Sequence, residues 1–117
     1  APIAAKQAIQ WMIADMAIEL EALRSLVYRT AWMMDSGDTG REFSTMAAMC
    51  KVFGSEVACR AADVAVQIHG GMGYMKKYPI ERMYRDARIT RIFEGTNEVQ
   101  REIIARNLFR SVGLRLR

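Results

Sequence analysis

The fold of this chain is constrained most by two long stretches that keep a helical spacing of apolar residues and are joined by a short run of turn formers. No glycine or proline interrupts residues 3–35, where apolar side chains recur at spacings of three and four, as on one face of a helix. This stripe consists of Ile9, Met12, Ile13, Met16, Leu20, Leu23 and Val27. The stretch ends at residues 36–40, Ser-Gly-Asp-Thr-Gly, and so short a connection favours an antiparallel return.

The return, residues 41–69, is the second predicted helix and has two non-polar faces. Its large apolar stripe is Met46, Met49, Phe53, Val57, Ala61, Val64 and Ile68. Its second face carries only the small residues Ala47, Gly54, Ala58, Ala62 and Ala65. Small side chains let neighbouring helices approach closely, so we expect this helix to be contacted on more than one side. The glycines of residues 70–73 end it.

The last part of the chain predicts a short helix, an irregular segment and a final helix. Pro79 suits the first turn of a helix that extends to about residue 88, and residues 89–95 look irregular. Thr96 or Asn97 can cap a helix that runs to about residue 112, with Glu98 in its first turn, where the helix dipole favours negative charge. No strand pattern is found. We therefore expect an all-α, up-down helical bundle in a single domain, residues 1–117, whose long helices pack against other domains or subunits.

Composition narrows the functional classes. With 51% hydrophobic and 26% charged residues the chain resembles an ordinary globular protein, and no apolar run is long enough to predict a membrane span. Residues 75–117 carry eleven Lys and Arg against five Asp and Glu, which suggests an anionic partner such as a phosphate-bearing cofactor or nucleic acid. A solvated helix face is the alternative explanation. The final helix lacks the interleaved aromatics of a single-strand binder, so we do not expect a nucleic-acid partner.

The cysteines and the single histidine suggest neither a disulfide nor a metal site. Cys50 and Cys59 are nine residues apart in a helical pattern, point to opposite sides and cannot bridge each other. Free thiols fit a reducing compartment. No cluster of residues has metal-ligand spacing, and His69 has no serine and aspartate arrangement around it.

Two loops could carry chemistry. Residues 67–74, Gln-Ile-His-Gly-Gly-Met-Gly-Tyr, let a ligand or another backbone come close, or they form only a helix C-cap and turn. Residues 91–98, Arg-Ile-Phe-Glu-Gly-Thr-Asn-Glu, place a carboxylate between an aromatic residue and a glycine just before a helix start. If Phe93 shields Glu94 from water, the carboxylate becomes a stronger base. A solvated glutamate in a turn is the alternative.

Four segments in order resemble the C-terminal signature of the acyl-CoA dehydrogenases. They are residues 67–74 (QIHGGMGY), 78–82 (YPIER), 85–88 (RDAR) and 92–101 (IFEGTNEVQR). The resemblance covers essentially the whole chain, but only the C-terminal helical domain of the enzyme. It implies that residues 1–117 are a fragment of a larger flavoenzyme. The isolated fragment is expected to be inactive.

The resemblance also implies residue roles. Glu94 matches the base that removes the α-proton of an acyl-CoA thioester, while the β-hydrogen leaves as hydride to FAD and trans-2-enoyl-CoA forms. Phe93 and Gly95 match substrate-binding positions. Gln67, Gly70 and Gly71 match the loop that meets the adenine end of an FAD held by a neighbouring subunit, and Thr96 and Glu98 match FAD contacts beyond the base.

The same resemblance implies partners and a compartment. These are an acyl-CoA substrate, an electron-transferring flavoprotein as electron acceptor, a homo-oligomer (dimer or tetramer), and the bacterial cytoplasm or the mitochondrial matrix. Related acyl-CoA oxidases share the fold and pass electrons to oxygen; the short chain pattern favours a dehydrogenase. A non-catalytic helical interaction or oligomerisation module is the alternative function, and a basic nucleic-acid-binding bundle is a weaker one.

Overall fold

The architecture of this computed structural model, which describes residues 1–116, is helical throughout. The elements are a 3₁₀ turn η1 (Ile3–Ala5) and the helices α1 (Gln7–Asp35), α2 (Arg41–His69), α3 (Gly71–Tyr74), α4 (Ile80–Ile89) and α5 (Asn97–Ser111). No strand occurs within the described residues. The predicted all-α, up-down bundle is confirmed.

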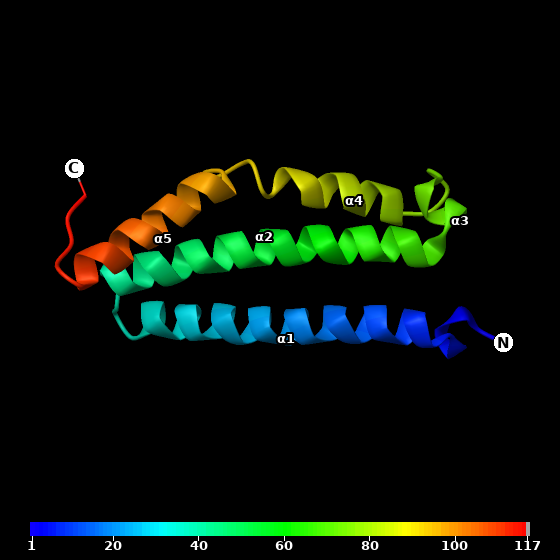
Figure 1. Cartoon of the computed structure of the whole chain (residues 1–117), viewed down its shortest axis with the longest axis horizontal. Helices are drawn as coiled ribbons and strands as arrows, with labels where there is room; N and C mark the ends of the chain where they lie inside the picture. Colours follow the sequence, from blue (N-terminus) through cyan, green and yellow to red (C-terminus); the bar gives the residue numbers. More distant parts are fainter. Residues whose placement is uncertain (117) are drawn as a thin grey trace.

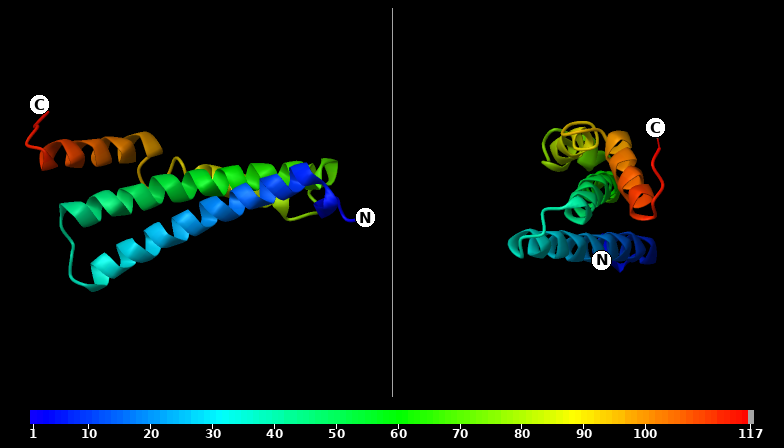
Figure 2. Two further views of the ribbon diagram at one scale, coloured as in Figure 1. Left: turned by 60° about the horizontal axis from the view of Figure 1, so that its bottom comes forward. Right: turned by 90° about the vertical axis from the view of Figure 1, so that its left-hand side faces the viewer.

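The helices form three layers with α2 in the middle (Figures 1 and 2). α1 runs antiparallel to α2 along one side, and α4 and α5 follow each other along the other side. Among the long helices, α1 contacts only α2, whereas α2 also contacts α3, α4 and α5. The described chain measures 58 × 25 × 24 Å. The expectation that α2 is contacted on more than one side is confirmed.

The inward face of α1 is narrower than the predicted stripe. Its buried and half-buried residues alternate at spacings of three and four: Ile9, Met12, Met16, Glu19, Leu23, Leu26, Thr30 and Met33. Ile13, Leu20 and Val27 of the predicted stripe are 46%, 48% and 41% exposed. The cause is that α1 packs against a single helix, and one partner covers only a heptad seam.

Three other local features differ from the sequence prediction. α1 begins at Gln7 rather than near residue 3, because Lys6 adopts an extended backbone (φ −82°, ψ 127°) after the 3₁₀ turn. The glycine-rich stretch after α2 is not a simple turn, because Gly70 turns the chain with φ 63° and the short helix α3 follows. Pro79 lies immediately before α4 and not inside it.

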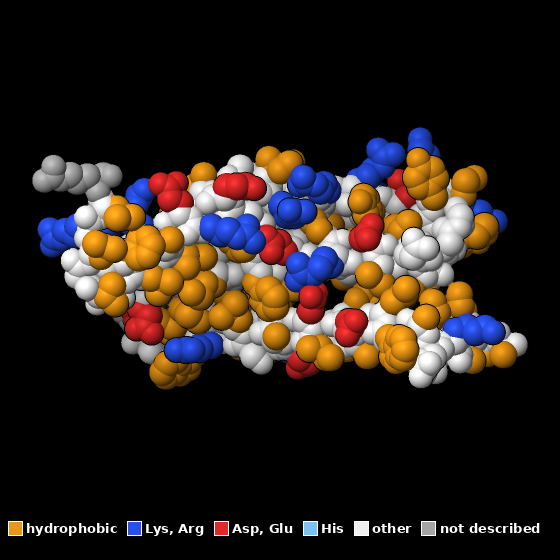
Figure 3. Space-filling model, in the orientation of Figure 1, with side chains coloured by type: hydrophobic (Ala, Val, Ile, Leu, Met, Phe, Trp, Pro, Cys, Tyr) orange, Lys and Arg blue, Asp and Glu red, His pale blue; other side chains and the backbone are white. Residues whose placement is uncertain are grey.

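The core lies along α2. The buried apolar residues are Met33, Met46, Ala48, Val52, Val57 and Ala62. Gly54 lets α1 approach: a Cβ there would lie 3.4 Å from Leu23 Cδ1. Figure 3 shows hydrophobic side chains along the seam between α1 and α2, with Lys and Arg side chains mainly on the α4 and α5 side.

Local interactions confirm the expected helix start and free cysteines. Thr96 is the N-cap of α5, its Oγ1 accepting a hydrogen bond from Val99 N at 3.3 Å. Cys50 and Cys59 are both free and half-buried. None of the helices in residues 1–116 is apolar enough, over a sufficient length, to cross a membrane.

Candidate functional site

The segment between α4 and α5 is a tight loop with unusual backbone angles. Ile92 N and Phe93 N both donate to Ile89 O, and Asn97 N closes the loop by donating to Arg91 O at 3.1 Å. Glu94 has φ 58° and is the one non-glycine residue with positive φ in the described chain; Gly95 follows with φ 81°. Left-handed backbone is unfavourable for a residue with a Cβ, so the rest of the loop must hold Glu94 in place.

A polar network fastens this loop to the middle of α2. Lys51 Nζ donates to Gly95 O and to Asn97 Oδ1, both at 2.7 Å. Asn97 is only 2% exposed, and its Nδ2 donates to Ser55 Oγ at 2.9 Å. Gln100 Nε2 donates to Glu94 O at 3.1 Å. Both peptide carbonyls that follow the left-handed residues are therefore bonded to side chains of neighbouring helices.

Phe93 and Glu94 are exposed in the described chain. Phe93 is 49% exposed, and the Glu94 side chain has no hydrogen-bond or ion-pair partner among residues 1–116. The shielding expected from Phe93 is thus not provided by these residues alone. Glu94 N has no backbone acceptor in the described part of the chain, which leaves an N–H donor beside the carboxylate.

The second predicted loop lies at the far end of α2. Gln67, Gly70 and Gly71 are all exposed, and a Cβ on Gly70 or Gly71 would meet nothing within 4 Å. Gly73 is different: it is buried, and a Cβ there would lie 2.7 Å from His69 Cβ and 2.9 Å from Val66 O. Gly73 therefore serves the packing of α3 on α2, while the backbone at Gly70 and Gly71 is open to a ligand.

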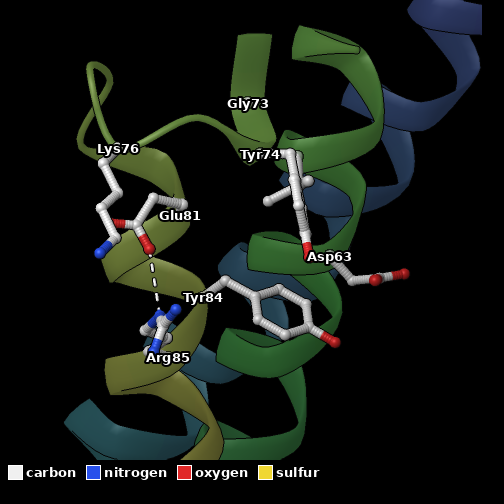
Figure 4. A pocket seen from close by; sticks show the side chains of 8 residues that line it. Asp63, Gly73, Tyr74, Lys76, Glu81, Tyr84 and Arg85 are labelled. Carbon is white, nitrogen blue, oxygen red and sulfur yellow. Dashed lines mark hydrogen bonds and ion pairs between the residues drawn. The ribbon is translucent and has the colours of Figure 1, made fainter. Parts of the chain in front are cut away.

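A cavity of about 640 Å³ adjoins this glycine loop between α2, α3 and α4 (Figure 4). Its lining includes Gly73, the rings of Tyr74 and Tyr84, Asp63, and the Arg85–Glu81 ion pair, in which Arg85 Nε lies 3.1 Å from Glu81 Oε2. No residue of the Glu94 loop lines it.

The structure groups the predicted site residues into two places. Phe93, Glu94, Gly95, Thr96 and Glu98 form the loop and first turn of α5, beside the middle of α2. The glycine loop with Gln67 lies at the α2 end near α3, and no hydrogen bond among the described residues joins the two.

Two carboxylates near the Glu94 loop have shifted acidity. The pKa of Glu98 is lowered by its own backbone N–H and then by the Thr96 side chain, so Glu98 is anionic at neutral pH. The pKa of Glu56 is lowered chiefly by the hydrogen bond from Arg101, which joins α2 to α5. An ionised carboxylate only accepts hydrogen bonds, so Glu98 can serve donor groups of a ligand.

Sequence reasoning missed the network residues Lys51, Ser55 and Gln100, and it considered Asn97 only as a cap. A signal was present for two of them. Lys51 and Ser55 are one turn apart on a face of α2 that otherwise carries Ala48, Cys59 and Ala62. Polar side chains on such a small, apolar face indicate a partner from another element.

Residues 1–109 match the family model described as the acyl-CoA dehydrogenase C-terminal domain. The chain belongs to the acyl-CoA dehydrogenase family.

Individual relatives agree with this assignment. The chain is 53% identical to an acyl-CoA dehydrogenase of Bacillus subtilis, over 92% of this chain and 27% of that protein. It is 51% identical to an acryloyl-CoA reductase (NADH) of Anaerotignum propionicum, over 93% and 27%. The butyryl-CoA dehydrogenase structure from Megasphaera elsdenii superposes with a TM-score of 0.88 at 43% identity, over 93% of this chain and 28% of that one. The chain thus spans little more than a quarter of the length of these relatives.

Proposed function

We propose that this chain is the C-terminal helical domain of a larger FAD-dependent enzyme that dehydrogenates acyl-CoA thioesters to trans-2-enoyl-CoA, with Glu94 as the base. Family membership supports the reaction class. The observation that carries the residue assignment is the left-handed backbone of Glu94, held by hydrogen bonds at both following carbonyls. Strained non-glycine residues persist where the surroundings over-determine them, and they cluster at active sites.

In this proposal Glu94 acts as the base that abstracts a proton. Its carboxylate takes the proton from the α-carbon of the thioester, the C–H electron pair forms the new double bond, and hydride departs from the β-carbon. FAD, when bound, supplies the two-electron acceptor for that hydride. The Glu94 N–H, which has no backbone acceptor within residues 1–116, donates to the thioester carbonyl and stabilises the charge that develops there.

Phe93 and Gly95 flank the base and bound the substrate. Gly95 has no side chain, so the acyl chain can approach the carboxylate. The exposed side of Phe93 contributes one apolar wall. Because Phe93 and Glu94 are both exposed in this domain, the water-excluded pocket is completed by other parts of the full enzyme.

The residues present fit FAD at two positions. Gln67, Gly70 and Gly71 offer an amide and an unobstructed backbone for the adenine end of FAD held by a neighbouring subunit. Thr96 and the anionic Glu98 offer oxygen acceptors beside the base. The separation of the two loops along α2 agrees with contacts to two different FAD molecules in a homo-oligomer. An electron-transferring flavoprotein is the proposed electron acceptor, and two free thiols suit a reducing compartment, the bacterial cytoplasm or the mitochondrial matrix.

The test is Glu94→Gln in the full-length protein, assayed by acyl-CoA-dependent dye reduction with flavin content measured in parallel. We expect kcat to fall by at least about 10²–10⁴, because general-base catalysis contributes that much, with flavin still bound. Glu102→Gln is the matched control, since Glu102 lies exposed on α5 and its one ion-pair partner within residues 1–116 is Arg106. Unchanged turnover of the Glu94→Gln variant rejects the assignment.

A non-catalytic interaction module is the second candidate function. It is favoured by the exposed apolar residues of α1, among them Trp11 and Trp32 at 61% and 68% exposure. Under this hypothesis the full-length protein binds neither flavin nor acyl-CoA, and Glu94→Gln changes nothing. Stoichiometric flavin in the purified full-length protein excludes it.

A further inference from the structure

In the described structure, Lys51 makes the one hydrogen bond from α2 to the backbone of the Glu94–Gly95 pair, and it makes a second bond to the side chain of Asn97. Lys51 Nζ lies 2.7 Å from Gly95 O and 2.7 Å from Asn97 Oδ1. The contact joins residues that are 44 and 46 positions apart in sequence. One ammonium group therefore links the middle of α2 to both ends of the turn that follows Glu94.

The charge of Lys51 is directed to these neutral oxygens. No carboxylate of residues 1–116 forms an ion pair with Lys51. A half-buried ammonium without a carboxylate partner is placed at a cost in solvation, which its two charge-assisted hydrogen bonds offset. A lysine that served solubility alone would extend into solvent.

The second acceptor of Lys51 is itself fixed. Asn97 is 2% exposed, its Nδ2 donates to Ser55 Oγ at 2.9 Å, and its backbone N–H donates to Arg91 O at 3.1 Å. The Lys51 ammonium thus donates to Gly95 O while its other acceptor, the Asn97 side chain, is held in place by its own hydrogen bonds. Because the Gly95 carbonyl belongs to the same turn as Glu94, this bond limits rotation of the left-handed pair.

We propose that Lys51 is a positioning residue for proton abstraction: by holding Gly95 O and Asn97 Oδ1 it fixes the backbone of Glu94, and with it the direction of the carboxylate and of the adjacent N–H. This inference rests on the proposed function of Glu94. Lys51 touches no reacting atom. It acts through the loop, so its loss slows the chemical step without removing the base.

The experiment compares Lys51→Met with wild type in the full-length flavoenzyme. Single-turnover dehydrogenation of an acyl-CoA is expected to slow by about 10–100-fold, since a misplacement of about 1 Å costs about that much. Flavin content and the Kd of the acyl-CoA are expected to stay within about twofold. Hydrogen exchange of peptides that cover residues 90–98 is expected to rise, while exchange in α1 is unchanged.

Lys6→Met is the matched control, because it makes the same change outside the loop, at the start of α1. Lys51→Arg keeps the charge and the donors, and is expected to recover at least about fivefold of the lost rate. If the Met variant loses flavin, the Arg variant and the exchange data decide. A Lys51→Met rate within twofold of Lys6→Met, or a folded Arg variant as slow as Met, overturns the proposal.

Glu94→Gln, run beside these variants, separates the two claims. If Glu94→Gln retains turnover, the proposed function fails whatever Lys51 does. If Glu94→Gln abolishes turnover while Lys51→Met leaves both the rate and the exchange of residues 90–98 unchanged, only the positioning role fails.

Discussion

Gly95 combines two constraints at a single residue. Its φ of 81° belongs to the left-handed region, and a Cβ would lie 2.7 Å from Gln100 Nε2, the group that holds Glu94 O. We expect Gly95→Ala to cost about 1–2 kcal/mol of stability from backbone strain and also to displace Gln100, so that turnover of the full enzyme falls. Urea denaturation of the domain and turnover of the full enzyme check this.

Gly37→Ala is the control for the backbone term. Gly37 has φ 84°, but a Cβ there meets nothing within 4 Å. It should therefore lose similar stability and keep full turnover. Equal turnover of the two variants would show that the Gln100 contact does not matter.

Asn97 carries the most buried polar side chain of the described residues. Removing it leaves Ser55 Oγ with only Val52 O as a partner and takes away one of the two acceptors of Lys51. We expect Asn97→Ala to lower the free energy of unfolding by about 1–3 kcal/mol. Asn107→Ala is the comparison, because Asn107 is half-buried and, in the described part of the chain, its side chain bonds only to Thr45 Oγ1. It should cost less, and an equal loss in chemical denaturation would contradict the network's importance.

At the residue scale, local chemistry was predictable and long-range pairing was not. A cap at Thr96 or Asn97 and Glu98 in the first turn of α5 follow from neighbours in sequence; the structure places the cap at Thr96 and confirms Glu98. The contact of Lys51 with Gly95 depends on how α2 packs against a loop 44 residues later. No local pattern encodes that distance, and the polar pair Lys51 and Ser55 indicated only that some partner exists.

The junction of α2 and α3 depends on one of its glycines. A Cβ on Gly73 would lie 2.9 Å from Val66 O, which is backbone and cannot move aside, whereas a Cβ on Gly71 meets nothing. Gly73→Ala is expected to lower stability by about 1–3 kcal/mol through overpacking. Gly71→Ala should change it by less than about 0.5 kcal/mol. Thermal unfolding of the two variants side by side decides, and similar melting temperatures would refute the close approach.

The pairing of α2 with α5 predicts a pH dependence. Arg101 holds the pKa of Glu56 below its ordinary value of 4.5, so the ionised pair stabilises the fold above that value, and the contribution is lost as pH falls through the lower pKa of the folded state. Glu56→Gln should lower stability at neutral pH and flatten the decline below about pH 4.5. Glu102→Gln removes the exposed ion pair with Arg106, which lies within α5. This variant should keep the steep loss of stability below about pH 4.5.

At the element scale, helix existence was predictable and helix faces only in part. The periodicity of α1 indicated a helix, yet it could not say how many neighbours that helix has. With α2 as its single partner, α1 buries a heptad seam and leaves Ile13, Leu20 and Val27 exposed. The predicted start of α1 was also wrong, because no residue pattern around Lys6 indicates the 3₁₀ turn.

The whole molecule buries little for its length. Among the described residues, no large side chain is less than 2% exposed. On one side of α1, Trp11, Ile18 and Trp32 are 61%, 67% and 68% exposed. The seven-residue spacing from Trp11 to Ile18 keeps these side chains on one face. Open faces of this kind mark interaction surfaces. The sequence predicted a bundle whose long helices pack against other domains or subunits, but it did not show which face of α1 stays open, since periodicity does not reveal how many helices cover it.

Self-association follows as a prediction for the isolated chain. We expect gel filtration to give an assembly larger than the 13.3 kDa monomer, and the triple variant Trp11→Ser, Ile18→Ser, Trp32→Ser to shift it toward monomer. Substituting serine for Ile3, which is 55% exposed outside α1, is the control and should not change the elution. A compact monomer at every concentration would count against the surface.

Because α2 lies in the middle layer and contacts both loops, the number of its residues sets the distance between them. Lys51 and Gln67 lie sixteen residues apart on this helix, which is about 24 Å at 1.5 Å per residue. Inserting one residue between them would rotate one end by about 100° against the other, whereas seven inserted residues restore the angle to within about 20° and add about 10 Å. Under the proposed function, changes of length within this segment would therefore alter the spacing between the substrate at Glu94 and the adenine end of the FAD held by the neighbouring subunit, even when every contacting residue is kept.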